Sequence, residues 1–156
     1  MNDWPRQAEA QAFYGNPRGR GGQASSRWEA RNLIIFKPPF RMTYGESPVS
    51  GFRIHRLCAA SLARVLQAIW ARAGHDQMKV DDWGASLFGG AYHFRLMRGS
   101  NRLSMHAYGC AIDLAPERFP MGRSRPAFCT DVRDAFAAEG WLNLPKDRMH
   151  FQAAKL

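Results

Sequence analysis

The chain lacks a long apolar run, the apolar core of a secretory signal and a paired set of cysteines. No stretch of about 18 apolar residues occurs in its 156 residues, so we expect no transmembrane helix. Residues 1–15 are polar, so we expect synthesis in the cytoplasm without a classical signal. The three cysteines are an odd number without paired spacing, which argues against a disulfide framework.

Internal repeats and a dividing linker are also missing, which favours a single domain over residues 1–156, expected to be a monomer. Within it, residues 1–50 form an N-terminal extension without a recognisable motif, and residues 51–153 form the expected catalytic core. A hydrophobic content of 46% with 12% aromatic residues excludes a disordered chain by composition.

Positive charge dominates the chain, with a net charge of +9 and a pI near 10.2. Such a chain favours an anionic partner, which could be nucleic acid, a membrane surface or a polymer of the bacterial envelope. The arginines are scattered, and helix-turn-helix, zinc-finger and aromatic-platform patterns are absent. We therefore expect no nucleic-acid partner, and a simple solvated basic surface remains the alternative.

The hydrophobic pattern predicts a mixture of helices and strands. Apolar periodicity predicts helices over residues 3–14, 56–73 and 131–139, with Asp3 and Thr130 as the N-caps of the first and last. Short apolar or alternating runs predict strands over residues 32–36, 41–44, 49–54, 89–97, 110–114 and 148–152. The Gly/Arg-rich stretch 15–26 reads as a surface loop rather than a phosphate-binding loop. Together these elements predict an α+β fold, a small antiparallel sheet with helices packed on one side.

Asp113 interrupts the apolar run 110–114, and a buried carboxylate is costly unless a cation or hydrogen-bond donors satisfy it. Strand alternation places Asp113 on one face with Ala111, whose small side chain leaves space beside it. Gly109 permits a sharp bend before the strand, so His106 can fold back towards Asp113. Alternatively, Arg95 or Arg98 could pair with this carboxylate.

A catalytic zinc ion takes three protein ligands and a water, so a metal site here needs a third ligand. His150 is favoured because Asp147 precedes it by three residues and could take a proton from a metal-bound water. Each histidine taken alone could equally be a hydrogen-bonded structural residue. The other candidates for the third ligand are His55, His75 and His93.

Residues 104–113 read S-x-H-x-x-G-x-A-x-D, and residues 147–150 read D-x-x-H. This pair of motifs resembles the family of zinc D-Ala-D-Ala carboxypeptidases and L-alanyl-D-glutamate endopeptidases, which includes VanY-like and VanX-like enzymes and phage endolysins. The resemblance covers roughly residues 85–153. Aspartate at position 147, where relatives also carry glutamate, is similar to the endolysin-type branch. The implied fold is the one shared by Hedgehog and D,D-peptidase domains.

The resemblance implies a zinc site with a general base and an arginine beside it. Asp147 would be the base that activates water. Arg95, or as second choice Arg98, would stabilise the oxyanion or a substrate carboxylate. Ser104 would orient the site through a hydrogen bond behind the ligands. The zinc ligands would be His106, Asp113 and His150.

The function expected from this resemblance is zinc-dependent hydrolysis of peptidoglycan stem peptides, as an endolysin-like L-alanyl-D-glutamate endopeptidase. A D-alanyl-D-alanine carboxypeptidase is the alternative enzyme, and a cell-wall-binding or phage-particle assembly module is the alternative without catalysis. The enzyme would act in the periplasm or cell wall after release by a holin or from a phage particle. Residues 141–146 are shorter than the Gly/Trp-rich stretch of many endolysin-type members, which puts the substrate register in question.

Overall fold

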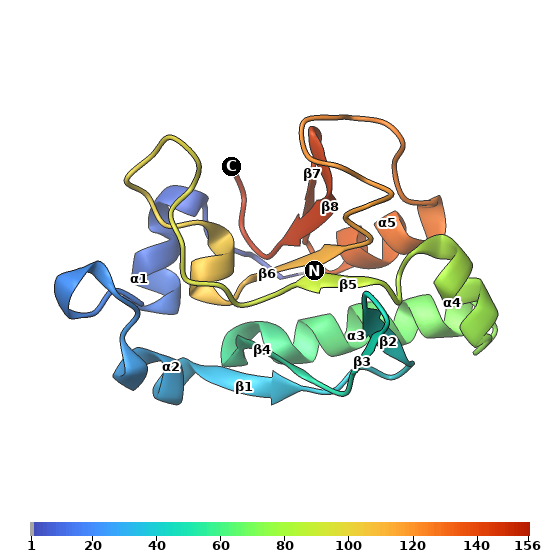
Figure 1. Ribbon diagram of the computed structural model, residues 1–156, viewed down its shortest axis with the longest axis horizontal. Coiled ribbons are helices and arrows are strands. Elements are labelled where there is room, and N and C mark those ends of the chain that lie inside the picture. The colour runs from blue at the N-terminus through green and yellow to red at the C-terminus, as the bar shows by residue number, and fades with distance from the viewer. Residues whose placement is uncertain (1) are drawn as a thin grey trace.

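A four-stranded antiparallel sheet carries the site in the computed structural model, which describes residues 2–156 (Figure 1). The strand order is β5-β6-β8-β7. Ile112 lies opposite Phe151 in the β6–β8 ladder, and Asp113 lies opposite His150. Alternation therefore gives the sheet a core face and a polar face. The strands are β5 (Phe88–Gly90), β6 (Ala111–Leu114), β7 (Leu142–Leu144) and β8 (Asp147–Gln152).

Helices α3 (Arg56–Arg72) and α5 (Thr130–Ala138) contact each other and bury their apolar stripes in one core. The Phe136 ring of α5 stacks on Phe151 of β8 at a centroid distance of 3.9 Å. In Figure 1, α3 runs beneath the four-stranded sheet. The predicted α+β fold with a small antiparallel sheet is confirmed.

The N-terminal half supplies a second layer of short elements. Strand β1 pairs antiparallel with β4, and β2 pairs with β3 as a hairpin. Trp4 and Tyr14 belong to the same buried cluster as the α3 stripe. The elements of this half are η1 (Gln7–Glu9), α1 (Ala10–Tyr14), η2 (Arg20–Gly22), α2 (Ser26–Asn32), β1 (Leu33–Phe36), β2 (Met42–Tyr44), β3 (Ser47–Val49), β4 (Phe52–His55) and α4 (Gln77–Trp83).

The strand predicted over residues 89–97 is wrong beyond Gly90. The ladder to β6 ends there, and residues 91–104 form a loop apart from a single bridge between Leu96 and Leu103. The alternating aromatic residues of this segment are typical of a strand, which explains the wrong prediction. However, the Ala91 carbonyl accepts a hydrogen bond from a histidine side chain and does not take part in a ladder.

The helix predicted over residues 3–14 is shorter in the structure, where only η1 and α1 form from residue 7 onwards. The backbone around Pro5 instead makes hydrogen bonds to Lys155 near the C-terminus. Lys155 N donates to the Pro5 carbonyl, and Gln7 N donates to the Lys155 carbonyl. Asp3 forms an ion pair with Lys155 and caps no helix. The helix over 131–139 is confirmed, but it begins at Thr130 with Cys129 as N-cap and no side-chain cap bond. Helices α2 and α4 and strands β3 and β7 were not predicted, and the strand predicted over residues 49–54 begins as β4 only at Phe52.

Candidate metal centre and its cleft

Three side chains from three elements converge on the polar face of the sheet. Asp113 Oδ1 lies 3.2 Å from His106 Nε2 and 3.0 Å from His150 Nδ1, and the two nitrogens are 3.1 Å apart. His106 lies on η3 (Met105–Tyr108), Asp113 on β6 and His150 on β8. The three residues that the sequence motifs predict as ligands are therefore brought together as one cluster.

Gly109 makes this convergence possible, because the chain turns there from η3 into β6. Its φ is +70°, in the left-handed region that disfavours a Cβ. A Cβ at this position would lie 2.7 Å from Leu33 Cδ2 and 2.9 Å from the backbone nitrogen of His55. Close packing against β1 and the start of α3 thus fixes the turn that aims His106 at Asp113.

Hydrogen bonds behind the two histidines assign their tautomers. His106 Nδ1–H donates to the Ala91 carbonyl at 2.6 Å, which leaves a lone pair on Nε2. His150 Nε2–H donates to Gln152 Oε1 at 2.8 Å, which leaves a lone pair on Nδ1. The Gln152 amide in turn donates to Gln7 Oε1 at 3.0 Å. Both unprotonated nitrogens therefore face the carboxylate oxygen.

A cation fits this arrangement well. Three electron-pair donors at 3.0–3.2 Å with no proton between them repel one another unless a positive charge lies at their centre. Bond lengths of about 2.0–2.1 Å in a tetrahedral zinc site separate its ligand atoms by roughly 3.3 Å. Two imidazole nitrogens and one carboxylate oxygen suit zinc and leave a fourth position for water or substrate.

The electrostatics of Asp113 agree with a role as an anionic ligand. Burial raises the pKa of Asp113, but His106 and His150 more than offset this when each carries a proton that faces the carboxylate, and the pKa then falls well below its usual range. A metal ion held in place of those protons would favour the ionised carboxylate in the same way. The side chain is 20% exposed, so the charged group remains open to the cleft beside it. Asp113 therefore stays ionised at any pH at which the protein is expected to work.

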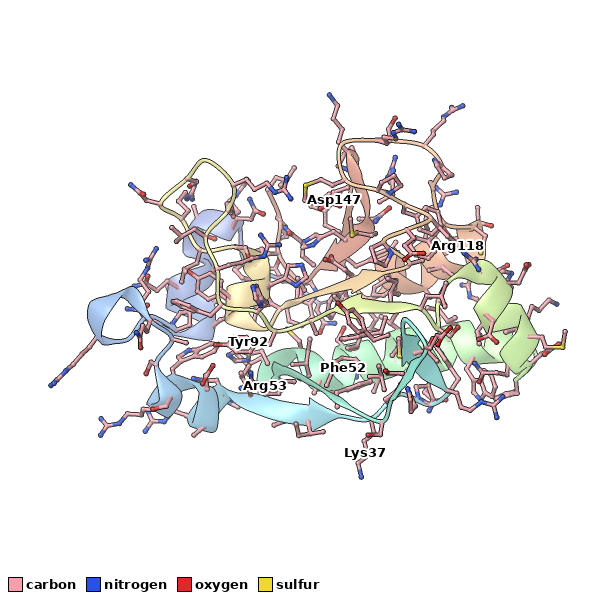
Figure 2. The ribbon with its side chains drawn as sticks, in the orientation of Figure 1. Lys37, Phe52, Arg53, Tyr92, Arg118 and Asp147 are labelled. Carbon is pink, nitrogen blue, oxygen red and sulfur yellow. The ribbon has the colours of Figure 1, made fainter. Side chains whose placement is uncertain are left out.

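Asp147 lies at the start of β8, near the upper end of that strand in Figure 2. Burial raises its pKa and the Asp113 charge adds to the rise, while His150, His106 and Arg95 oppose it. Its Oδ1 is buried and has no hydrogen-bond partner among residues 2–156. A carboxylate of raised pKa whose charge interacts with Asp113, His106 and His150 has the properties of a general base.

A cleft of about 590 Å³ opens beside the cluster of the three candidate ligands and is lined in part by His106 and Asp113. Its walls come from the β2–β3 hairpin and β4 on one side and from residues 88–95 on the other. Arg95 lines this cleft, whereas Arg98 is exposed on the loop beyond it and does not. Of the two arginines named from the sequence, the structure therefore favours Arg95 on position.

The remaining histidine candidates lie outside the ligand cluster. His55 caps α3, because its Nδ1 accepts from Leu57 N at 3.0 Å while Nε2–H donates to the Tyr14 carbonyl at 3.0 Å. His75 lies in the exposed turn after α3, and His93 lines the cleft. All three are structural or peripheral relative to the three-ligand cluster.

Ser104 is buried, but its hydroxyl has no hydrogen-bond partner among the described residues. Its backbone N–H donates to the Arg95 carbonyl at 3.0 Å and so connects the cleft wall to the start of η3. The orienting role of its hydroxyl stays a prediction.

Three further residues of the site escaped the sequence reasoning. Gln152 follows His150 by two positions in β8, so strand alternation places both on the same face. That spacing was a usable signal. Arg53 and Tyr92 line the cleft from β4 and from the segment after β5, and only the tertiary fold brings them together.

A comparison with known protein families supports the set of candidate ligands predicted from the motifs. The family model described as D-alanyl-D-alanine carboxypeptidase matches residues 98–153, which include Asp147 and the three predicted ligands. The chain has no significant match among curated proteins or solved structures. The family match supports a peptidase that acts on peptidoglycan, and the endolysin-type branch stays a prediction. In the described part of the chain, no helix is long and apolar enough to cross a membrane.

Proposed function

We propose that this protein is a zinc-dependent peptidase that hydrolyses peptidoglycan stem peptides. The observation that carries the proposal is the cluster of His106 Nε2, Asp113 Oδ1 and His150 Nδ1 at the side of an open cleft. Both histidine tautomers are held so that their lone pairs meet the carboxylate. The family match over residues 98–153 supports the substrate class.

In the proposed mechanism, His106, Asp113 and His150 hold the metal. When bound, a zinc ion would supply Lewis acidity and lower the pKa of a water molecule towards about 7. Asp147 takes a proton from the attacking water. The water oxygen forms a bond to the scissile carbonyl carbon.

Collapse of the tetrahedral species then breaks the carbon–nitrogen bond, and Asp147 returns the proton to the leaving amine. Arg95 lies where its charge reaches Asp147 and where it lines the same cleft as Asp113. Its guanidinium provides donors for the oxyanion that develops on the carbonyl. Each proposed residue thus has one role in the movement of a proton or the stabilisation of charge.

Two bonds of the stem peptide are candidates. Aspartate rather than glutamate at position 147 supports the L-alanyl-D-glutamate bond, whereas the description of the matching family supports release of a terminal D-alanine. We retain the endopeptidase as the first proposal and the carboxypeptidase as the second. The endopeptidase proposal includes delivery of the enzyme to the wall by a holin or on a phage particle.

Digestion of purified peptidoglycan with metal-loaded protein, followed by mass spectrometry of the soluble fragments, tests the proposal. A new D-glutamate amine identifies the endopeptidase, and free D-alanine identifies the carboxypeptidase. The matched controls are chelated protein, which should release neither product, and the Asp147→Asn variant, which should release either product far more slowly. If folded, metal-loaded protein binds the wall but cleaves no type of peptidoglycan, the enzyme proposal is refuted and a wall-binding or assembly module takes its place.

A further inference from the structure

A second pocket, separate from the cleft, is lined by residues of α1, α2 and the start of α3. Its volume is about 490 Å³, and it shares no lining residue with the cleft beside the candidate ligands. Three exposed arginines line this pocket, Arg27, Arg31 and Arg56, and no acidic residue does. In Figure 1, α1 and α2 lie at the end of the molecule opposite α4. The pocket therefore gathers positive charge at a place that the proposed mechanism does not use.

The carboxylates nearest to these arginines in the sequence are engaged elsewhere. Of the three in residues 2–32, Asp3 pairs with a lysine near the C-terminus, Glu9 accepts from a backbone N–H of its own turn, and Glu29 accepts from a tyrosine hydroxyl at the cleft. Glu29 lies midway in sequence between the two arginines of α2, which places it on the opposite side of that helix. None of the three pocket arginines forms a salt bridge within residues 2–156.

The positions of these arginines are unfavourable in the free protein. Arg27 and Arg31 are four positions apart on one face of α2, where like charges repel each other. Arg56 is the first residue of α3, and a positive charge is unfavourable at the N-terminal end of a helix. The first turn of α3 contains no acidic residue that would offset it. An anion bound among the three guanidinium groups would relieve both effects.

Hydrogen bonds and close packing order the pocket before any ligand arrives. Arg56 Nε donates to Asn32 Oδ1 at 3.3 Å, and the buried Asn32 amide donates to the Trp28 carbonyl at 3.1 Å. Trp28 Nε1 donates to the Tyr14 carbonyl at 3.0 Å, which joins α2 to α1. Gly15 has a φ of +86°, and a Cβ there would lie 2.7 Å from Trp28 Nε1, so this wall leaves no room for a larger residue.

The donors of the pocket suit a phosphate group better than a single carboxylate. A phosphate presents more acceptor oxygens than a carboxylate, and each guanidinium can bind two of them through its planar fork. The Ser25 hydroxyl, which also lines the pocket, accepts from Trp28 N at 3.2 Å and keeps its hydrogen for a further bond. A pocket of this volume also holds the polyol or sugar unit attached to the phosphate. Arginine side chains, and not the glycine backbone of residues 15–26, would supply most of the contacts.

We propose that Arg27, Arg31 and Arg56 form a binding pocket for a phosphodiester group of an anionic polymer of the bacterial envelope. The choice of this polymer rests on the proposed function, because an enzyme that hydrolyses peptidoglycan works among such polymers. Binding at a pocket separate from the cleft raises the local concentration of stem peptides around the enzyme and leaves the cleft free.

Calorimetric titration with poly(glycerol phosphate) at fixed salt tests the proposal, and a DNA duplex and vesicles of phosphatidylglycerol are titrated separately. A pocket variant carries Arg27→Gln, Arg31→Gln and Arg56→Gln. A matched control variant loses the same charge from exposed residues that line neither the pocket nor the cleft, through Lys37→Gln, Arg41→Gln and Lys79→Gln. Hydrolysis of one short stem peptide, which is too small to reach both places, is measured with each protein.

The pocket variant should bind the polymer roughly 10- to 100-fold more weakly than wild type and the control variant do. It should hydrolyse the short peptide with unchanged kcat/KM and melt no lower than wild type, because the repulsion within α2 is removed. Replacement of the same three arginines by lysine should retain part of the binding, because the charge remains without the planar fork.

A pocket variant that binds the polymer within twofold of wild type, or a control variant that loses as much affinity, would overturn the proposal while the peptidase function stands. Tighter binding to DNA or to the vesicles that depends on the three arginines would overturn the choice of polymer in favour of nucleic acid or a membrane. Polymer binding that depends on these arginines, in protein that hydrolyses no stem peptide, would support the pocket and refute the peptidase.

Discussion

Replacement of Gln152 by leucine should weaken metal binding, although this residue does not reach the metal. Gln152 is only 1% exposed, and its Oε1 accepts the His150 Nε2–H at 2.8 Å. Leucine fills a similar volume without an acceptor, so the buried N–H loses its partner at a cost of about 1–3 kcal/mol. The proton can then move to Nδ1, which removes the lone pair that faces Asp113.

The expected loss is 10- to 100-fold in zinc affinity, or about 1.4–2.7 kcal/mol. Competition with a chromophoric chelator at fixed pH measures it. Gln152→Glu keeps the acceptor and should bind zinc at least as tightly as wild type. Gln67→Leu on the exposed face of α3 is the matched control and should have no effect. Folded Gln152→Leu with zinc affinity within twofold of wild type would refute the argument.

Three further substitutions test other parts of the account. Asp147→Asn should lower kcat by roughly 10²- to 10⁴-fold, with zinc affinity measured in the same sample nearly unchanged, because Asp147 is a base and not a ligand. Burial lowers the pKa of His55 from 6.5 to about 4, so the unfolded state takes up the proton first. The contribution of neutral His55 to stability is therefore present above pH 6.5 and is lost as the pH falls towards 4. Between pH 7 and pH 5, the free energy of unfolding measured with urea should fall by about 2 kcal/mol more in wild type than in His55→Asn. Gly109→Ala should lower the free energy of unfolding by more than about 1–2 kcal/mol, because the positive φ and the contact with Leu33 both oppose a Cβ, and thermal unfolding that matches wild type would contradict this.

The convergence of His106, Asp113 and His150 could be expected from the sequence because part of the information is local and the resemblance of the two motifs supplied the rest. Alternation along β6 places Asp113 opposite the apolar face, and Gly109 marks the turn that returns His106. The order of the two motifs then selects His150 from several histidines. The same local reasoning fails at residues 91–97, where an alternating pattern precedes a loop whose carbonyl supports His106.

The cleft could not be predicted in this way. Arg53 and Tyr92 lie far apart in the chain, and their contact depends on how the β1–β4 pair packs relative to the segment after β5. The support of Gln152 by Gln7 likewise depends on the pairing of the N-terminal segment with Lys155 near the C-terminus. Such contacts follow from tertiary packing, which leaves no periodic signal in either segment.

A titration of metal-free protein with zinc, in which bound metal and hydrolysis of one stem peptide are measured in the same samples, tests the central claim most directly. The account predicts that activity is absent at the start and rises in proportion to bound metal up to one equivalent. His106→Ala, which removes one of the three ligand atoms, should lose both signals together. Hydrolysis by the metal-free protein, or one tightly bound equivalent without hydrolysis of any stem peptide, would contradict it.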